Sequence, residues 1–366
     1  MIHGHVRYSY ALHTYPEDRT PIEHQWSTLL HALGPHSLYQ TWEWFRHQVE
    51  GPRQAHWGRV FVLSVHTGER LIAMLPLRET TLTIGTVRLP ALSLPWERAA
   101  ASAVLADPQY STDDLLGSAG HWLAAKIPAW QLVALPRLVE GSPFAGGTAL
   151  DLRRRIARSG SGSTKRIAAT GSMPDYLKTL STKARAGIRN AANRLRGHQV
   201  TLVSLTQPGP DLDAGLEAFY ALEAAGWKNL SSVSRIPTEM LVRALAQHGQ
   251  ARIDLMSIDG TPAAVALSCR PGDGVHYVYK IAYSENLAYF SPGRVLLHDM
   301  IASCFEDATV TTIDFMSDSD WLSPFDPASS SLSSVYVFRR SLRGQALLWA
   351  AALRAYHRGR LRRTPR

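Results

Sequence analysis

The fold of this chain is built around residues 275–316, VHYVYKIAYSENLAYFSPGRVLLHDMIASCFEDATVTTIDFM. Residues 275–283 carry aromatic and β-branched side chains, which suit a pleated strand, and residues 311–316 predict a second strand. Between them, apolar residues recur at helical spacing from 296 to 305 and predict a helix that packs one side onto a sheet. Because side chains alternate along a strand, one face is expected to carry Tyr277, Tyr279, Ile281 and Tyr283, with Lys280 on the other.

The start of that helix, Ser291-Pro292-Gly293-Arg294, predicts an anion site. Ser291 is expected to cap the helix, Pro292 fits the first helical position, and Gly293 lets a ligand approach the backbone closely. Free amides at the helix start, the helix dipole and the Arg294 cation all favour negative charge. The same residues also make an ordinary helix start, so a phosphate role depends on the surrounding site. With the two strands, they predict a site for a phosphorylated cofactor or substrate.

The composition is that of a globular protein with an anionic partner. At 366 residues the chain is long enough for two domains, and 45% hydrophobic with 19% charged residues is typical of folded proteins. The net charge of +9 favours a nucleotide, a nucleic acid, an anionic polymer or a lipid surface, without choosing among them.

The cysteines and histidines exclude several classes of protein. Cys269 and Cys304 are the only cysteines, too few for a disulfide framework or a four-ligand zinc site. The scattered histidines lack the spacing of metal ligands, so no metal is expected. The N-terminus lacks the apolar core of a signal peptide, and no apolar run reaches the roughly 18 residues of a membrane span. We therefore expect a cytoplasmic protein.

The order of elements repeats between the two halves. The first half is predicted to run helix, helix, antiparallel strands, helix and strand, at residues 22–33, 41–49, 60–89, 113–126 and 130–135. The second half follows the same plan, beginning with one long helix at 173–196 and including a hairpin turned by Asp259-Gly260. We predict two similar α/β domains at 1–150 and 166–340, each with a mostly antiparallel sheet flanked by helices. A linker at 151–165 joins them, and a basic tail follows at 341–366.

Five segments of the second half occur in a distinctive order. They are KARAGIRNAANRL (183–195), ALEAAGWK (221–228), IDLMSIDGTPAAVAL (253–267), YVYKIAYSENLAYFSPGRVLL (277–297) and TTIDFM (311–316). In this order they resemble the CelD-type acetyltransferases of the GNAT superfamily, which are tandem GNAT-fold proteins related to the Fem-type aminoacyl transferases of cell-wall synthesis. The resemblance covers residues 173–318 well and the first half more loosely.

The resemblance implies transfer of an acyl group, from acetyl-CoA or another acyl-CoA, to an amine or hydroxyl. In the GNAT plan the strand before the phosphate-binding helix offers backbone donors to the thioester carbonyl, which here would be Tyr279 to Ala282, including Lys280. The helix start holds the pyrophosphate, which here would be Ser291 to Val295. This sequence keeps only Gly293 of the glycines in the usual signature, so an aminoacyl-tRNA donor stays open.

Acyl transfer from a thioester needs a neutral nucleophile, stabilised charge on the carbonyl oxygen and a proton for the leaving thiolate. We predict Glu223 or Asp314 as the base, although a surface helix charge and a strand-end cap are the ordinary explanations of these residues. Tyr279 is predicted as the general acid by its position on the strand. Lys280 is expected to pair with Asp314 or with a substrate anion.

The substrate contacts are predicted on two helices. Trp227 and Lys228, at the end of one helix, are predicted to bind the substrate, and Trp227 would wall the acceptor site or simply cover the end of the sheet. Lys183, Arg185 and Arg189 form a basic helix face that would clamp a phosphate or carboxylate, or would only be solvated.

The leading hypothesis is a cytoplasmic acyl-CoA-dependent transferase acting on a saccharide or amino-acid-like acceptor in envelope polysaccharide synthesis. The alternatives are a Fem-like aminoacyl-tRNA-dependent transferase and a degenerate, non-catalytic adaptor of polysaccharide machinery. The basic tail would touch an anionic membrane or be a solvated end. A DNA-binding protein is not expected, because the sequence has no helix-turn-helix or zinc signature.

Overall fold

The computed structural model describes residues 7–50, 58–84, 86–95, 104–147, 149–226 and 235–361, with the side chains of all but residue 84 and residues 353–361. The chain forms two compact units. Unit 1 comprises Met1–Gly34, Gln54–Gly162 and Ser331–Arg366, and unit 2 comprises Pro35–Arg53 and Ser163–Ser330. Both contain a mixed sheet flanked by helices, which confirms the predicted α/β class. These spatial units do not decide the predicted domain ranges, which stay a prediction.

Unit 1 is built on the strand order β1-β2-β3-β4-β6-β14. Strands β1 to β4 form an antiparallel meander, β4 and β6 are parallel, and β14 pairs antiparallel with β6. Short strands β5 and β7 pair with β3 and β8. The elements are β1 (Tyr8–Tyr15), α1 (Arg19–Leu33), β2 (Val60–Thr67), β3 (Arg70–Ile84), β4 (Val87–Ser93), β5 (Leu105–Ala106), α3 (Thr112–Lys126), β6 (Leu132–Leu138), β7 (Leu150–Asp151), β8 (Ile156–Ala168), β14 (Ala328–Phe338) and α9 (Leu342–Leu361).

Helix α3 supplies much of the unit 1 core. Leu115, Leu116 and Leu123 lie on one face of the helix and are buried against the sheet. Gly120 passes Val337 of β14 so closely that a Cβ there would lie 2.9 Å from its Cγ1. The predicted amphipathic pattern over 113–126 is therefore confirmed, and it joins two parallel strands of one sheet.

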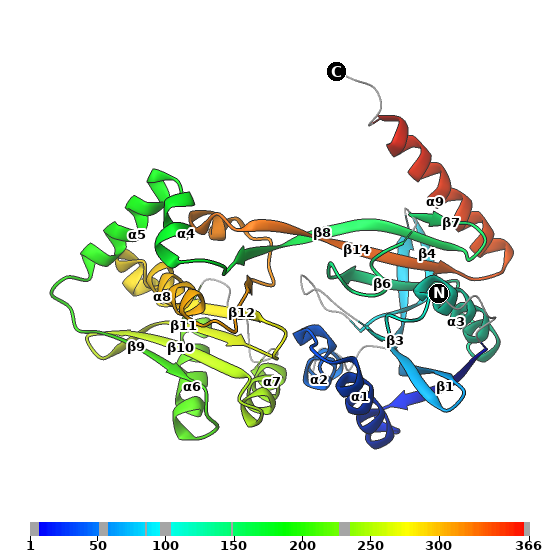
Figure 1. Cartoon of the computed structure of the whole chain (residues 1–366), viewed down its shortest axis with the longest axis horizontal. Coiled ribbons are helices and arrows are strands. Elements are labelled where there is room, and N and C mark those ends of the chain that lie inside the picture. The colour runs from blue at the N-terminus through cyan, green and yellow to red at the C-terminus, as the bar shows by residue number, and fades with distance from the viewer. Residues whose placement is uncertain are drawn as a thin grey trace. The chain divides into compact units, whose positions relative to one another are not determined.

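Unit 2 is built on the strand order β8-β13-β12-β11-β10-β9. Helices α6 and α7 cover one face of this sheet, and α8, with α4 and α5 beside it, covers the other (Figure 1). The elements are η1 (Leu38–Gln40), α2 (Trp42–Val49), α4 (Met173–Thr179), α5 (Thr182–Arg194), β9 (Val200–Leu205), α6 (Pro210–Ala225), α7 (Arg235–Gln247), β10 (Ala251–Ile258), β11 (Thr261–Cys269), β12 (Val275–Tyr283), η4 (Glu285–Phe290), α8 (Pro292–Glu306), β13 (Thr312–Asp314) and η5 (Asp320–Phe325).

Two predicted elements need correction. The long helix expected at 173–196 is broken into α4 and α5, because Leu180 is buried in an extended conformation and the Ser181 hydroxyl accepts the Ala184 amide to start a new helix. The segment 151–165 was expected to be a loop, but it carries most of β8. Its glycines and serines indicated a loop, but their small side chains are tolerated in a paired strand.

Strand β12 also departs from regular alternation. Its pairing with β11 shifts register, so that Leu267 faces Lys280 while Ser268 faces Val278, and Tyr279 is the extra residue of a β-bulge. Val278 and Ile281 pack with the α8 side, whereas Tyr279 and Lys280 both face α6 and α7. The predicted common face of Tyr279 and Ile281 is therefore wrong, and so is the opposite orientation of Lys280. The bulge changes the phase of the strand.

No helix among the described residues is both long enough and apolar enough to cross a membrane.

Candidate active site

The parallel strands β12 and β13 separate after three residue pairs. Their pairing joins Val275–Tyr277 to Thr312–Asp314 and goes no further. On the β13 side the chain turns away at Met316, which has a left-handed φ of 50°. On the β12 side the bulge at Tyr279 increases the local bend. The continuation of β12 therefore faces an opening instead of a neighbouring strand.

Asp314 fixes this divergence. Its buried carboxylate accepts the Thr164 hydroxyl at 2.7 Å, the Arg166 Nε at 2.9 Å and the Met316 amide at 2.7 Å. The predicted pairing of Asp314 with Lys280 is wrong, because these three donors surround the carboxylate. Asp314 is not among the residues that line the opening. The geometry therefore favours a structural role for Asp314, whose hydrogen bonds stabilise the turn after β13.

A pocket of about 240 Å³ occupies the opening. One wall is β12, and the other is the chain after β13. Helix α6 closes one end with its last turn. The lining residues are Leu222, Glu223, Gly226, Val278, Tyr279, Lys280, Ile281, Ala282, Tyr283, Glu285, Phe315, Ser317, Ser319 and Trp321. Predicted catalytic residues Glu223 and Tyr279 are thus brought together in one pocket.

Glu223 and Lys280 form an ion pair inside the pocket. Oε1 of Glu223 lies 3.6 Å from Nζ of Lys280, and their side chains are 12% and 20% exposed. Lys280 also lies 5.9 Å above the centre of the Phe219 ring and 5.6 Å from that of Tyr279. The β12 bulge makes this contact, because it turns Lys280 toward α6. Glu223 is therefore a carboxylate that lines the pocket with a cation beside it.

Tyr279 has a partner that the sequence did not single out. Its hydroxyl lies 2.8 Å from Nε2 of His47 on α2. The sequence predicted the helix at 41–49 but gave no signal that it joins unit 2, because that contact spans 232 positions along the chain. His47 is therefore a residue beside the site that sequence reasoning missed, as were the lining residues Ser317, Ser319 and Trp321.

The start of α8 keeps only part of the predicted anion site. Ser291 stands before the helix in a left-handed conformation, but its side chain makes no capping hydrogen bond. The amides of Arg294 and Val295 both donate to the Ser291 carbonyl, at 3.0 and 3.3 Å. Among the described residues the Gly293 amide has no such acceptor, and a Cβ there would have ordinary contact with the Tyr283 ring at 3.7 Å. Of the predicted free amides at residues 293–295, only that of Gly293 therefore has no backbone acceptor among the described residues.

Comparison with known proteins identifies the central part of unit 2. Residues 182–322 match the family described as an acetyltransferase (GNAT) domain. Residues 182–322 form a GNAT acetyltransferase domain. The prediction of an enzyme of the GNAT acyltransferase type is thereby confirmed. The matched segment includes every predicted site residue, whereas His47 lies outside the GNAT domain.

A solved structure shares the fold over most of the chain, and others are similar to a lower degree. The crystal structure of FemX has 13% identity and a TM-score of 0.57, covering 87% of this chain and 96% of that one. L-PGS from Bacillus licheniformis has 12% identity and a TM-score of 0.49, with 90% and 96% covered. A tandem GNAT protein from the clavulanic acid biosynthesis pathway has 13% identity and a TM-score of 0.46, with 90% and 98% covered. No curated protein matches. At these identities the likeness concerns the fold alone.

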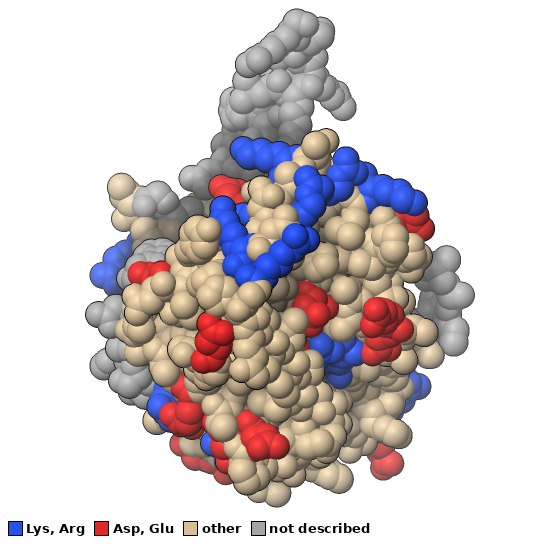
Figure 2. All heavy atoms as spheres, turned by 90° about the vertical axis from the view of Figure 1, so that its left-hand side faces the viewer, with Lys and Arg blue, Asp and Glu red and all other residues tan. Residues whose placement is uncertain are grey.

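The predicted basic clamp lies outside the GNAT-domain pocket. Figure 2 shows Lys and Arg side chains gathered on the face that carries α5, where Lys183, Arg185 and Arg189 are exposed. The Arg294 guanidinium lies over Gly187 of α5, where a Cβ would come within 2.8 Å of its Nη1. Helix α5 therefore passes the Arg294 cation at the start of α8. The predicted contacts Trp227 and Lys228 lie outside the described residues.

Within the described residues no group of three or more His, Cys, Asp or Glu side chains is placed to hold a metal ion.

Proposed function

We propose that this chain transfers an acetyl or other acyl group from acyl-CoA to an amine or hydroxyl acceptor in the pocket between β12 and β13. The observation that carries the proposal is the divergence of these strands after Tyr277 and Asp314. It leaves the β12 backbone along one wall of a pocket, where a thioester would lie against a preorganised strand edge. The Gly293 end of α8 and the Arg294 cation would receive the diphosphate.

Glu223 is the proposed base. A carboxylate that faces the pocket is placed to take a proton from the attacking amine or hydroxyl, and later to return it to the leaving thiolate. The C–N or C–O bond forms as the C–S bond breaks, and the proton passes through Glu223. Lys280, 3.6 Å away, would keep the carboxylate oriented.

The experiment measures thiol release from acetyl-CoA in the presence of a panel of amines and hydroxyl compounds. With an active acceptor, Glu223→Gln is expected to lower kcat by about 100-fold or more, the usual contribution of a general base. Glu217→Gln is the matched control, because Glu217 lies on the same helix with a 61% exposed side chain. Unchanged turnover in Glu223→Gln would remove the base from the mechanism. Absence of acetyl-CoA binding by calorimetry would remove the donor.

A second candidate donor is aminoacyl-tRNA, favoured by the exposed cations on α5. Such binding would be tight and strongly salt-dependent, because phosphate contacts release counterions. Arg185→Glu combined with Arg189→Glu would then weaken tRNA binding and reduce its salt dependence. If acyl-CoA is the donor, tRNA binds weakly and does not support transfer.

The acceptor class and the cellular role complete the proposed function. We propose a saccharide or an amino-acid-like molecule, and a role in envelope polysaccharide synthesis inside the cytoplasm, which rest on the CelD-type resemblance of the sequence. The acceptor panel above should therefore include amino sugars and amino acids. Turnover only with unrelated amines would set the polysaccharide role aside.

A further inference from the structure

The ring of His47 lies between two fixed polar groups of unit 2. Its Nδ1 is 3.1 Å from the carbonyl oxygen of Pro237, and its Nε2 is 2.8 Å from the hydroxyl of Tyr279. Helix α2 positions the ring, and the Thr41 hydroxyl caps that helix by accepting the Trp44 amide. The histidine thus connects the first turn of α7 with the β12 bulge.

These contacts fix which ring nitrogen carries the hydrogen. A carbonyl oxygen only accepts, so Nδ1 of His47 must donate to Pro237. Removal of the ring from water lowers the pKa of His47 to about 4; the Pro237 carbonyl opposes this shift, and the nearby Lys280 charge adds to it. The ring is therefore neutral near pH 7, and Nε2 is an acceptor. It follows that the Tyr279 hydroxyl donates its hydrogen to His47.

Aromatic neighbours hold the phenol in this orientation. The Trp44 ring meets the Tyr279 ring edge-on, with centroids 5.9 Å apart and planes at 86°. The His47 ring meets it at 5.4 Å, also at 86°. The Thr238 hydroxyl lies 3.5 Å from the phenol oxygen, at the limit of a hydrogen bond. Since the phenol hydrogen is engaged by His47, Thr238 can only be a donor to that oxygen.

We propose that His47 is a positioning residue of the transfer site, which sets the Tyr279 phenol oxygen as a hydrogen-bond acceptor toward the pocket. That oxygen would then hold an N–H or O–H of the acceptor while Glu223 takes the proton. No proton passes through the His47–Tyr279 pair. This role differs from the general acid predicted for Tyr279, because the acidic hydrogen is directed away from the pocket. The inference rests on the proposed acyl transfer.

The orientation itself is tested without any substrate. In protein labelled with ¹⁵N-histidine, the His47 ring should show a protonated Nδ1 and an unprotonated Nε2 from pH 8 down to about pH 5. Tyr279→Phe should shift the Nε2 resonance, because it removes the hydrogen bond. A protonated Nε2, or an Nε2 resonance unchanged by Tyr279→Phe, would overturn the proposal.

The functional role is tested by a double-mutant cycle on thiol release. His47→Leu is expected to lower kcat by roughly 3- to 10-fold, the value of one oriented hydrogen bond, with little change in the KM for acetyl-CoA. His47→Gln should recover most of this loss, since its amide oxygen can accept from Tyr279. In a Tyr279→Phe background His47→Leu should have no further effect, because His47 acts only through the phenol.

His24→Leu is the matched control, since its side chain is exposed on α1 of unit 1. If His47→Leu costs the same factor with and without the Tyr279 hydroxyl, its effect is structural and the proposal fails. If wild-type protein binds no acetyl-CoA and releases no thiol, the proposed function fails, while the ring resonances still decide the orientation of the pair.

Discussion

Helices α3 and α8 have the same place in their units but begin in opposite ways. Each connects two parallel strands, β4 to β6 in unit 1 and β12 to β13 in unit 2. Helix α3 opens with the acidic residues Asp113 and Asp114, and the Ser111 hydroxyl accepts the Asp114 amide at 3.3 Å. Helix α8 opens with Pro292 and Gly293, has no acidic residue in its first turn and has no side-chain cap.

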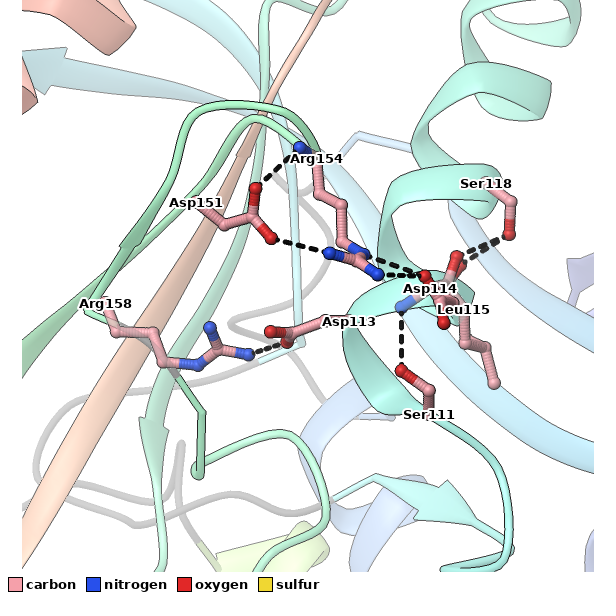
Figure 3. A network of polar contacts seen from close by, with 8 residues as sticks. All are labelled: Ser111, Asp113, Asp114, Leu115, Ser118, Asp151, Arg154 and Arg158. Atoms are coloured by element: carbon pink, nitrogen blue, oxygen red, sulfur yellow. Dashed lines mark hydrogen bonds and ion pairs between the residues drawn. The ribbon is translucent and has the colours of Figure 1, made fainter. Parts of the chain in front are cut away.

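Two cations beside the start of α3 are engaged by carboxylates of unit 1. Arg154 reaches both Asp114, at 2.6 Å, and Asp151, at 3.0 Å, and Arg158 pairs with Asp113 (Figure 3). A diphosphate at this helix start would meet negative charge and an occupied cap. At α8 the charge is positive, so only the helix of unit 2 is suited to an anionic donor.

The two parallel strand pairs, β4–β6 in unit 1 and β12–β13 in unit 2, also differ in where their pairing ends. In unit 1 the β4–β6 ladder covers Ala91–Ser93 and is extended at both ends by backbone hydrogen bonds from Gln131 to Pro90 and from Leu94 to Ala134. In unit 2 the corresponding ladder ends at Asp314 and the pocket begins. The parallel strands thus stay paired from Pro90 to Leu94 in unit 1, whereas in unit 2 they separate where the pocket begins.

The largest effect is expected on the unfolding free energy when the ion pair between Asp113 of α3 and Arg158 is removed. Arg158 has a side chain only 5% exposed, so Asp113→Ala removes a carboxylate partner from a buried cation and should cost about 3 kcal/mol of unfolding free energy. Asp114→Ala is the control on the next residue, whose side chain is 50% exposed, and should cost about 1 kcal/mol or less. Denaturant unfolding measures both. If both variants lose the same unfolding free energy, the buried ion pair of Arg158 stabilises unit 1 no more than the exposed ion pair of Asp114 does.

The next largest effect is expected on acetyl-CoA binding when an acidic residue, as found at the start of α3, is placed at the start of α8. Gly293→Asp places a carboxylate where the diphosphate would lie and should weaken acetyl-CoA binding by about 10- to 100-fold, through repulsion. Gly293→Ala is the control, because its Cβ would have only ordinary contact with Tyr283. Calorimetry on both folded variants gives the affinities. Unchanged affinity in Gly293→Asp would place the donor elsewhere and remove the contrast between the helix starts.

The sequence predicted the elements that depend on local patterns. Strand β12 has the predicted bounds 275–283, α3 begins one residue before the predicted 113, and Asp259-Gly260 turns the hairpin with positive φ at both residues. Periodicity and turn chemistry fix such elements because their causes lie within a few residues.

The site depends on contacts that no local pattern contains. The bulge at Tyr279 exists only in the register of β12 with β11, so period-2 alternation placed Lys280 on the wrong face. The hydrogen bonds from Thr164 and Arg166 to the Asp314 carboxylate likewise depend on the antiparallel pairing of β13 with β8. His47 was missed for the same reason. The sequence identified Glu223 and Tyr279 as candidates, whereas their partners come from long-range pairing.

The smallest effect is expected on the pH dependence of stability when Asp151, the second carboxylate partner of Arg154, is replaced. The Arg154 amide, at 2.9 Å, lowers the pKa of Asp151, and its guanidinium adds to the shift. Because the folded-state pKa lies below the unfolded value of about 3.9, the ionised group stabilises the fold above that value, and this contribution is lost as the pH falls through the folded-state pKa. Asp151→Asn should therefore cost about 1 kcal/mol at pH 6. At pH 3 the difference from wild type should be smaller, and unfolding free energies at the two pH values measure it. A difference that is constant or grows in acid would mean that the Asp151 charge is not engaged by Arg154, and the contrast with α8 would then rest on Asp113 and Asp114 alone.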